Sequence, residues 1–175
     1  MKPLWIVMGL TLSSNGFAAP PLQQVLPVVE ITDDEGGRVD GSPWNSEELK
    51  GKVQVLFYVD PDVKDLNSEF SAALKEQKFP RDQFGSVAII NMAATWLPNF
   101  AIASSLKKKQ EEFPHTVYVK DLKKKLVTSW NVGDDNNCVI LIDRQGKVLF
   151  AKDGKLSTEE ISTVIKLIQT QLASN

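Results

Sequence analysis

The sequence predicts an α/β protein, with a central mixed sheet and helices on both faces, over residues 19–175. Two observations predict this class. Apolar, β-branched segments alternate along the chain with segments whose apolar residues recur at helical spacing, which is typical of parallel strands joined by crossover helices. The last third of the chain instead has two strand-like segments around a short turn, followed by a helix. An antiparallel hairpin is therefore expected to complete the sheet of a single domain.

Residues 1–18 are expected to form a secretory signal peptide. Lys2 supplies the positive charge, residues 4–12 form a short apolar core, and Gly16 and Ala18 are the small residues of a cleavage site. Cleavage is expected after Ala18. An uncleaved membrane anchor is the alternative, but the apolar run is too short to cross a hydrocarbon core of ~30 Å. The mature chain is therefore expected to be secreted, without a stable membrane span.

The first half of the domain is organised around one strongly apolar strand. Residues 53–59 are β-branched, aromatic and nearly all apolar, as expected of a central strand covered on both faces. Before it, the sequence predicts a short strand at 28–31, a turn at 33–37 and one helical turn at 46–49 that Gly51 stops.

Helices and strands then alternate through the middle of the chain. Phe70 and Leu74 lie on one face of the first helix, which ends before Pro80. Ile102 and Leu106 lie on one face of the second helix. The predicted elements are a helix at 66–78, a strand at 84–91, a helix at 97–112, a strand at 116–120 and a short amphipathic turn at 126–130.

The C-terminal third has the clearest local signals. Strands are expected at 138–142 and 147–152, because Asp143-Arg144-Gln145-Gly146 between them is a good hairpin turn. Ser157 and Glu160 form a capping box that begins the last helix.

Composition and cysteine content exclude several functions. The chain is 42% apolar and 24% charged, as in ordinary folded proteins, and its net charge of −2 argues against general nucleic-acid binding. It has one cysteine, Cys138, so no intramolecular disulfide is possible. Cys138 opens an apolar strand, so we expect a buried structural thiol with no redox role.

Three stretches resemble thioredoxin-like secreted proteins and peroxiredoxins: Leu49-Lys50-Gly51-Lys52-Val53, Ile140-Leu141-Ile142-Asp143 with Gly146, and the final helix. This resemblance implies a thioredoxin-like fold. A closer resemblance is to the YtfJ-type family of periplasmic proteins of Gram-negative bacteria, which brings no assigned activity and implies a periplasmic location. The residues that carry it include Trp44-Asn45-Ser46, Ile90-Asn91, Ser104-Ser105-Leu106 and Ala151-Lys152-Asp153-Gly154.

The chain departs from the redox-active relatives at both parts of their active site. Their two cysteines lie about ten residues beyond the Gly-Lys pair, where this chain has Val63 and Leu66. Their cis-proline precedes the strand that here begins at Cys138, and the corresponding place is near Asn137. The resemblance therefore implies a protein that is neither a thiol–disulfide oxidoreductase nor a peroxidase.

Histidine and lysine give little sign of a site. The one histidine, His115, cannot form a zinc site with one cysteine, and no nucleophile motif accompanies it. The lysine runs 107–109 and 123–125 suggest either an anion or membrane-surface patch or ordinary solvated surface. The second interpretation is favoured, because acidic residues are interspersed nearby.

Two acidic loops form the most informative polar pattern. Asp60, Asp62 and Asp65 follow the central strand, while residues 134–137 precede the strand from Cys138. In a thioredoxin fold these loops face each other at the strand ends, where ligands of α/β sheets gather. Oxygen-rich clusters suit Ca²⁺ or Mg²⁺, although Asp and Asn are also favoured in ordinary turns and helix caps. The candidate metal ligands are Asp60, Asp62, Asp134 and Asp135.

Three functions follow as hypotheses. The first is a non-redox binding or interaction module that meets an unidentified periplasmic protein through the former active-site face. The alternative is an enzyme that uses carboxylates or a divalent metal at the same face, such as a metal-assisted hydrolase. A purely structural partner protein is the third.

Overall fold

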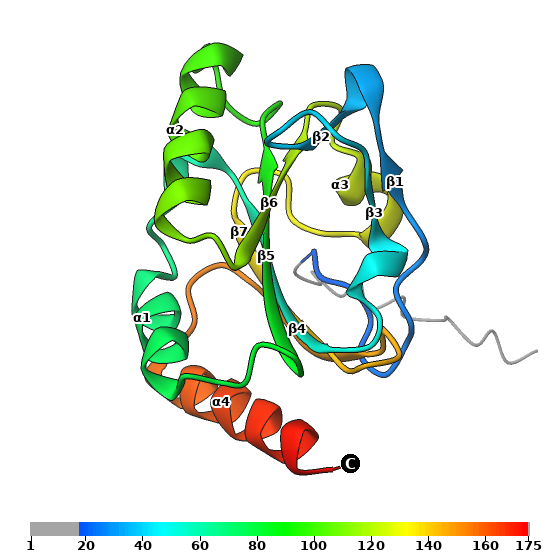
Figure 1. Ribbon diagram of the computed structural model, residues 1–175, viewed down its shortest axis with the longest axis vertical. Helices are drawn as coiled ribbons and strands as arrows, with labels where there is room; N and C mark the ends of the chain where they lie inside the picture. The colour runs from blue at the N-terminus through cyan, green and yellow to red at the C-terminus, as the bar shows by residue number, and fades with distance from the viewer. Residues whose placement is uncertain (1–17, 175) are drawn as a thin grey trace, which may run out of the picture.

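Six strands form one mixed sheet in the order β2-β6-β5-β4-β7-β8 (Figure 1). The computed structural model describes residues 18–174, so the predicted signal peptide, apart from Ala18, lies outside the described residues. β4 pairs with β5, and β5 with β6, in parallel, while the other three pairs are antiparallel. The strands are β2 (Gly36–Arg38), β4 (Val53–Val59), β5 (Phe84–Asn91), β6 (Thr116–Asp121), β7 (Asn137–Ile142) and β8 (Val148–Asp153).

Helices cover both faces of the sheet, as expected. α1 (Ser68–Gln77) and α2 (Asn99–Glu112) lie on one face with α4 (Thr158–Ala173), and α3 (Lys125–Trp130) lies on the other (Figure 1). α1 and α2 share a face because β4, β5 and β6 are added in one direction, and right-handed crossovers in one direction place successive helices on the same side. No helix within residues 18–174 is long and apolar enough to cross a membrane.

The core divides at the sheet because side chains alternate along each strand. Along β4, Val53 and Val55 face α1 and α4, whereas Leu56 and Tyr58 face the opposite side; all four are at most 1% exposed. Phe70 of α1 is fully buried, and burying a side chain of this size contributes roughly 1.5–3 kcal/mol.

An N-terminal segment completes the second face beside α3. β1 (Glu30–Ile31) and β3 (Trp44–Asn45) form a small antiparallel sheet. Trp44 meets Trp130 of α3 edge to face, with ring centroids 6.3 Å apart, and the Trp130 indole donates to the carbonyl of Pro27 at 2.8 Å. The two tryptophans therefore join residues far apart in sequence into one core.

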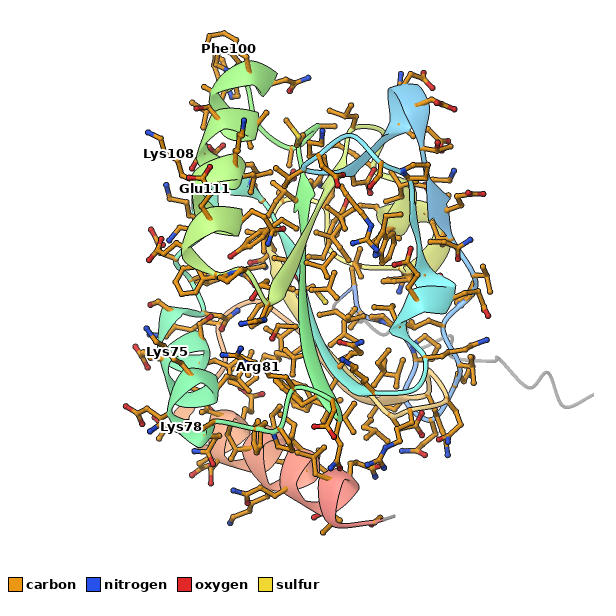
Figure 2. All side chains as sticks on the ribbon, viewed as in Figure 1. Lys75, Lys78, Arg81, Phe100, Lys108 and Glu111 are labelled. Carbon is orange, nitrogen blue, oxygen red and sulfur yellow. The ribbon has the colours of Figure 1, made fainter. Side chains whose placement is uncertain are left out.

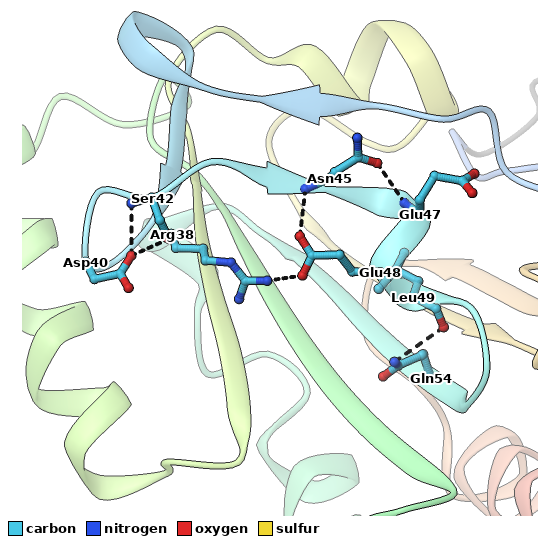
Figure 3. A network of polar contacts seen from close by, with 8 residues as sticks. All are labelled: Arg38, Asp40, Ser42, Asn45, Glu47, Glu48, Leu49 and Gln54. Atoms are coloured by element: carbon cyan, nitrogen blue, oxygen red, sulfur yellow. Dashed lines mark hydrogen bonds and ion pairs between the residues drawn. The ribbon is translucent and has the colours of Figure 1, made fainter.

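The predicted helical turn at 46–49 is present as the 3-10 helix η2 (Ser46–Leu49), and a network of polar contacts caps its N-terminus (Figure 3). Asn45 and Glu48 make a capping box, in which Asn45 accepts from the Glu47 amide at 2.9 Å and Glu48 accepts from the Asn45 amide at 3.2 Å. Arg38 of β2 pairs with Glu48. The network thus ties the edge strand β2 to the turn before β4.

The prediction of a turn at 33–37 is wrong in its second half. A short turn of 3-10 helix, η1 (Asp33–Glu35), leads into β2, which pairs with β6 at the sheet edge. Gly36 makes this pairing feasible: its φ is 130°, and a Cβ there would lie 1.9 Å from the carbonyl oxygen of Lys120. Paired glycines beside acidic residues are typical of turns, so the local pattern hides the strand.

The other predicted elements are confirmed within a few residues. β4 and β5 have the predicted limits, and the predicted helices 66–78 and 97–112 begin two residues later as α1 and α2. Ser157 and Glu160 form the predicted capping box of α4. The hairpin turn closes through a bond from the Gly146 amide to the carbonyl of Asp143 at 3.0 Å.

Replacing Gly36 with Ala should destabilise the protein more than replacing Gly41 with Ala. Both glycines have positive φ, but a Cβ at Gly41 would meet nothing within 4 Å, so this variant controls for backbone strain. The added methyl group at Gly36 must push β2 from β6, and overpacking of this kind costs about 1–3 kcal/mol. Urea unfolding followed by circular dichroism measures the difference. Equal losses would show that β2 tolerates the methyl group.

Candidate functional site

The two acidic loops meet where β4 ends and β7 begins. In the sheet, β4 lies between β5 and β7. The chain first adds β5 and β6 on one side of β4 and later adds β7 and β8 on the other side, so the strand order reverses at this point. The backbone amide of Asp60 donates to the carbonyl of Asn136 at 2.9 Å, which joins the loops directly. Open α/β sheets bind ligands at such points.

Asp60 is the most enclosed of the four candidate carboxylates, at 5% exposure. Its side chain caps the N-terminus of the short 3-10 helix η3 (Pro61–Val63) by accepting a hydrogen bond from the amide of Asp62 at 2.8 Å. Burial, followed by the charges of Asp62, Asp135 and Asp134, raises the pKa of Asp60, although the bond from Asp62 opposes the rise. The carboxylates are therefore close enough to repel one another.

Asp134 is largely satisfied within the protein. Lys124 donates to its carboxylate at 2.8 Å, and the buried Asn91 at the end of β5 donates to the same carboxylate at 2.9 Å and to the backbone carbonyl of Asp134 at 2.7 Å. Partial burial opposes ionisation, but the bonds from Lys124 and Asn91 prevail and lower the pKa of Asp134. Asp135 beside it is exposed.

The geometry offers the Ca²⁺ or Mg²⁺ hypothesis no ligand set. Within the described residues 18–174, no group of three or more histidine, cysteine, aspartate and glutamate side chains could hold a metal ion. Ca²⁺ alone takes 6–8 oxygen ligands. Asp60 and Asp134, two of the four candidates, instead accept hydrogen bonds that shape their own loops.

Asp62 links this site to the loop that follows β5. The Thr95 hydroxyl donates to the Asp62 carboxylate at 3.0 Å and accepts from the amide of Leu97 at 3.2 Å. Thr95 therefore holds the segment before α2 against the loop after β4. The Asp62 side chain is exposed, so its charge remains open to solvent.

A group of apolar side chains in this segment is uncovered. Trp96 is 97% exposed, Phe100 78% and Leu97 50%; together we call them the Trp96 patch. Phe100 projects from the N-terminal end of α2, away from the sheet (Figure 2). Single exposed apolar residues are common, but three large ones within five positions of the chain are typical of a contact surface.

Val63 and Leu66 stand where the resemblance places the redox cysteines. Val63 and Leu66 lie in the turn before α1, where the Leu66 amide donates to the carbonyl of Val63 at 3.0 Å. Residue 137, near the expected place of the cis-proline, is Asn, and no cis peptide bond occurs between residues 18 and 174.

Asn67 organises the interior behind these positions. It is 4% exposed. Its amide group donates to Asn137 at 3.2 Å and to the carbonyl of Gly154 at 3.1 Å, while its oxygen accepts from the Leu156 amide at 2.9 Å. One side chain thus connects the start of α1 with β7 and with the loop after β8.

Cys138 is fully buried in the core, as the sequence predicts. Burial, followed by the charge of Asp153 on the neighbouring strand, raises the pKa of the Cys138 thiol to about 12. A thiol that stays protonated at neutral pH is a poor nucleophile. Cys138 therefore contributes packing and has little reactivity.

The lysine run 123–125 is internally compensated. Lys123 pairs with Asp34 at 3.5 Å, Lys124 pairs with Asp134, and Lys125 pairs with Glu35. In the other run, Lys109 pairs with Glu112 at 3.3 Å. These contacts support the interpretation of the runs as ordinary surface.

Several residues at this edge are not singled out by the sequence analysis. The exposure of Trp96 could have been suspected from the sequence, because this large aromatic residue precedes a predicted helix and does not belong to the helix's apolar face. Nothing in the sequence pointed to Tyr58 and Asp121: the Tyr58 hydroxyl donates to the buried Asp121 carboxylate at 3.1 Å, and only the parallel register of β4, β5 and β6 brings them together.

Residues 22–171 match a family described as "Bacterial protein of unknown function (YtfJ_HI0045)". An uncharacterised protein of Haemophilus influenzae is 30% identical over 174 residues, which cover 94% of this chain and 95% of that protein. The uncharacterised protein YtfJ of Escherichia coli is 28% identical over 158 residues, 85% of each chain.

Two solved structures with similar architecture have titles that name thiol enzymes. A thiol peroxidase from Chromobacterium violaceum superposes with a TM-score of 0.62 at 13% identity, over 88% of this chain and 89% of that one. A thiol-disulfide isomerase from Corynebacterium glutamicum gives 0.58 at 16% identity, over 85% and 97%. At these identities the likeness shows the thioredoxin-like fold alone, which confirms the predicted fold class.

Replacing Asp60 with Asn should stabilise the protein at pH 7. The pKa of Asp60 is raised above its ordinary 3.8, so the folded state holds this proton more tightly than the unfolded state does. The ionised carboxylate therefore costs stability above the raised pKa, and this cost disappears as the pH falls below 3.8. Asn keeps an oxygen that accepts the bond from Asp62.

Urea unfolding of the Asp60→Asn variant and wild type between pH 3 and pH 7 measures the effect. The gain in unfolding free energy should be largest at pH 7 and shrink toward acid. Asp65→Asn, an exposed change in the same loop, should show a much smaller pH-dependent difference. A difference for Asp60→Asn that is constant with pH would contradict the crowding of carboxylates.

Proposed function

The chain belongs to the YtfJ_HI0045 family of bacterial proteins of unknown function, and on this premise we propose that it is a secreted periplasmic binding module without thiol chemistry. The proposed partner is a protein. The proposed contact surface is the Trp96 patch together with the acidic loops at the end of β4 and the start of β7.

The exposure of the Trp96 patch is the observation that carries this proposal. Water around a 97% exposed indole and a 78% exposed phenyl ring is released when a partner covers them, and this release favours association. Aromatic side chains supply much of the binding energy of protein interfaces. The bond between Thr95 and Asp62 supports the segment that carries them, so less freedom is lost on binding.

The residues at the redox positions support the exclusion of thiol chemistry. Exchange or peroxide reduction needs a thiolate that substrates can reach, whereas the chain's one cysteine, Cys138, is buried with a raised pKa. Export is supported by Lys2, the apolar core at 4–12 and the small residues before Ala19.

Purified protein should neither reduce insulin nor consume peroxide above background, and Cys138→Ser should leave both results unchanged. The same variant should lose about 1–3 kcal/mol of stability, because a hydroxyl replaces a buried thiol. Native Cys138 should react with iodoacetamide only after denaturation, as intact mass would show. Turnover that disappears in Cys138→Ser would contradict the proposed lack of thiol chemistry.

Affinity capture from periplasm tests the binding surface. The full chain is expressed with a C-terminal tag. The mass of the protein recovered from the periplasm should match a chain that begins at Ala19. The double variant Trp96→Ser, Phe100→Ser should retain at least about tenfold less of whatever protein wild type retains, since two aromatic anchors are lost. The matched control is Leu22→Ser, Val28→Ser, which changes residues 57% and 59% exposed elsewhere. Equal capture by both double variants, or no specific capture by wild type, would contradict the proposal.

A further inference from the structure

Three of the four candidate carboxylates make no ion pair within the described part of the chain. Asp60, Asp62 and Asp135 make no ion pair with any residue among 18–174, whereas Asp134 is neutralised by Lys124 at 2.8 Å. Two hydrogen bonds join the loops of these residues to one another and to the segment that carries the patch. Asp62 accepts from Thr95, the residue before Trp96, and Asp60 donates its amide to Asn136, the residue after Asp135.

The charges also act on one another. Asp60 is buried beside Asp62 and Asp135, and their charges add to burial in raising the pKa of its carboxyl group. A cation brought to this edge would relieve the repulsion at the same time as it gained attraction. Because Asp62 and Asp135 are exposed, such a cation can reach them from solvent.

We infer that the Trp96 patch and the carboxylates of Asp62 and Asp135 bind a cationic polypeptide segment of the partner. This rests on the proposed function and specifies its partner. A lysine or arginine side chain of the segment pairs with the carboxylates, and a neighbouring apolar side chain covers Trp96 and Phe100. Arginine suits both parts, since its guanidinium pairs with carboxylates and stacks on an indole.

Charge distinguishes this occupant from a membrane surface. Insertion of Trp96 and Phe100 into a bilayer would bring Asp62 toward anionic headgroups, which would repel it. The exposed lysines of α2 do not compensate, because Lys108 lies about two helical turns from Phe100 (Figure 2). Lys64 is the one basic residue of the loop 60–65, against three aspartates, so the loop beside the patch has a net negative charge.

Trp96 itself provides a direct readout. Trp44 and Trp130 are 1% and 2% exposed, whereas Trp96 is 97% exposed, so quenching by acrylamide in the mature protein reports mainly on Trp96. The probe is a synthetic decapeptide that alternates arginine and lysine with leucine. Its twin replaces every basic residue with glutamate. Binding of the basic peptide should shift the emission to the blue and protect Trp96 from acrylamide, and the acidic twin should do neither.

Neutralising the carboxylates tests the role of charge. Asp62→Asn, Asp135→Asn should raise the Kd for the basic peptide about tenfold at low salt, and added salt should narrow this difference through screening. The matched control is Glu111→Gln, Glu159→Gln, which removes two exposed carboxylates elsewhere. Thermal unfolding of both double variants confirms that each is folded.

The inference would be overturned by equal binding of the two peptides, by equal affinity of the neutralised variant and wild type, or by a blue shift with phosphatidylglycerol vesicles in place of the basic peptide. Concentration-dependent dimerisation that buries Trp96 without peptide would also overturn it, in favour of a second copy of the chain. If periplasmic capture still depends on Trp96 and Phe100 while the basic peptide does not bind, this inference fails and the proposed function stands. If neither the periplasmic capture nor the binding of the basic peptide depends on the Trp96 patch, both this inference and the proposed function fail.

Discussion

β4 is hydrogen-bonded along both edges, in parallel to β5 and in antiparallel register to β7, and both of its faces are covered. A strand in this position cannot shift by one residue without moving its apolar side chains to the wrong face, so its register is firmly set. The end of β4 therefore has a fixed place. Asp60 directly follows β4, and its amide donates to the carbonyl of Asn136 just before β7. The sheet therefore holds the loop after β4 against the loop before β7.

The polar side chains at this edge mostly bind one another. Asp121 accepts from Tyr58 and from the Leu126 amide at the start of α3, and Asn67 connects three elements. Groups used in this way stabilise the fold, because a buried polar group without a partner costs free energy. They are poorly placed for acid–base work on a ligand, which needs groups free to exchange protons. What remains accessible is the surface formed by Asp62, Asp135 and the Trp96 patch.

The proposed function requires a thioredoxin-like fold that binds without thiol chemistry, and this arrangement is compatible with it. The fold places loops from separate strands at one edge regardless of the residues they carry. With Val63 and Leu66 in the turn before α1 and Cys138 in the core, that edge has no accessible thiol. The accessible side chains at that edge are apolar and acidic, namely the Trp96 patch with Asp62 and Asp135.

The sequence by itself determined the elements whose signals are local. The apolar run 53–59, the capping box at Ser157 and Glu160 and the prolines that end helices act over a few neighbouring residues, so the limits of β4, β5 and α4 could be predicted closely. The absence of a second cysteine is likewise visible without a structure, and the meeting of the acidic loops followed once a thioredoxin-like topology was assumed.

The tertiary structure decided the rest. Gly36 belongs to a strand because of a close approach to Lys120, more than eighty positions away in the chain, which no local pattern reveals. Lys124 and Asn91 remove Asp134 from the acidic set, although neither is its neighbour in sequence. Leu97 and Phe100 resemble the first turn of an amphipathic helix, yet no element covers them. Periodicity can show which residues are apolar, but burial depends on what the rest of the chain places against them.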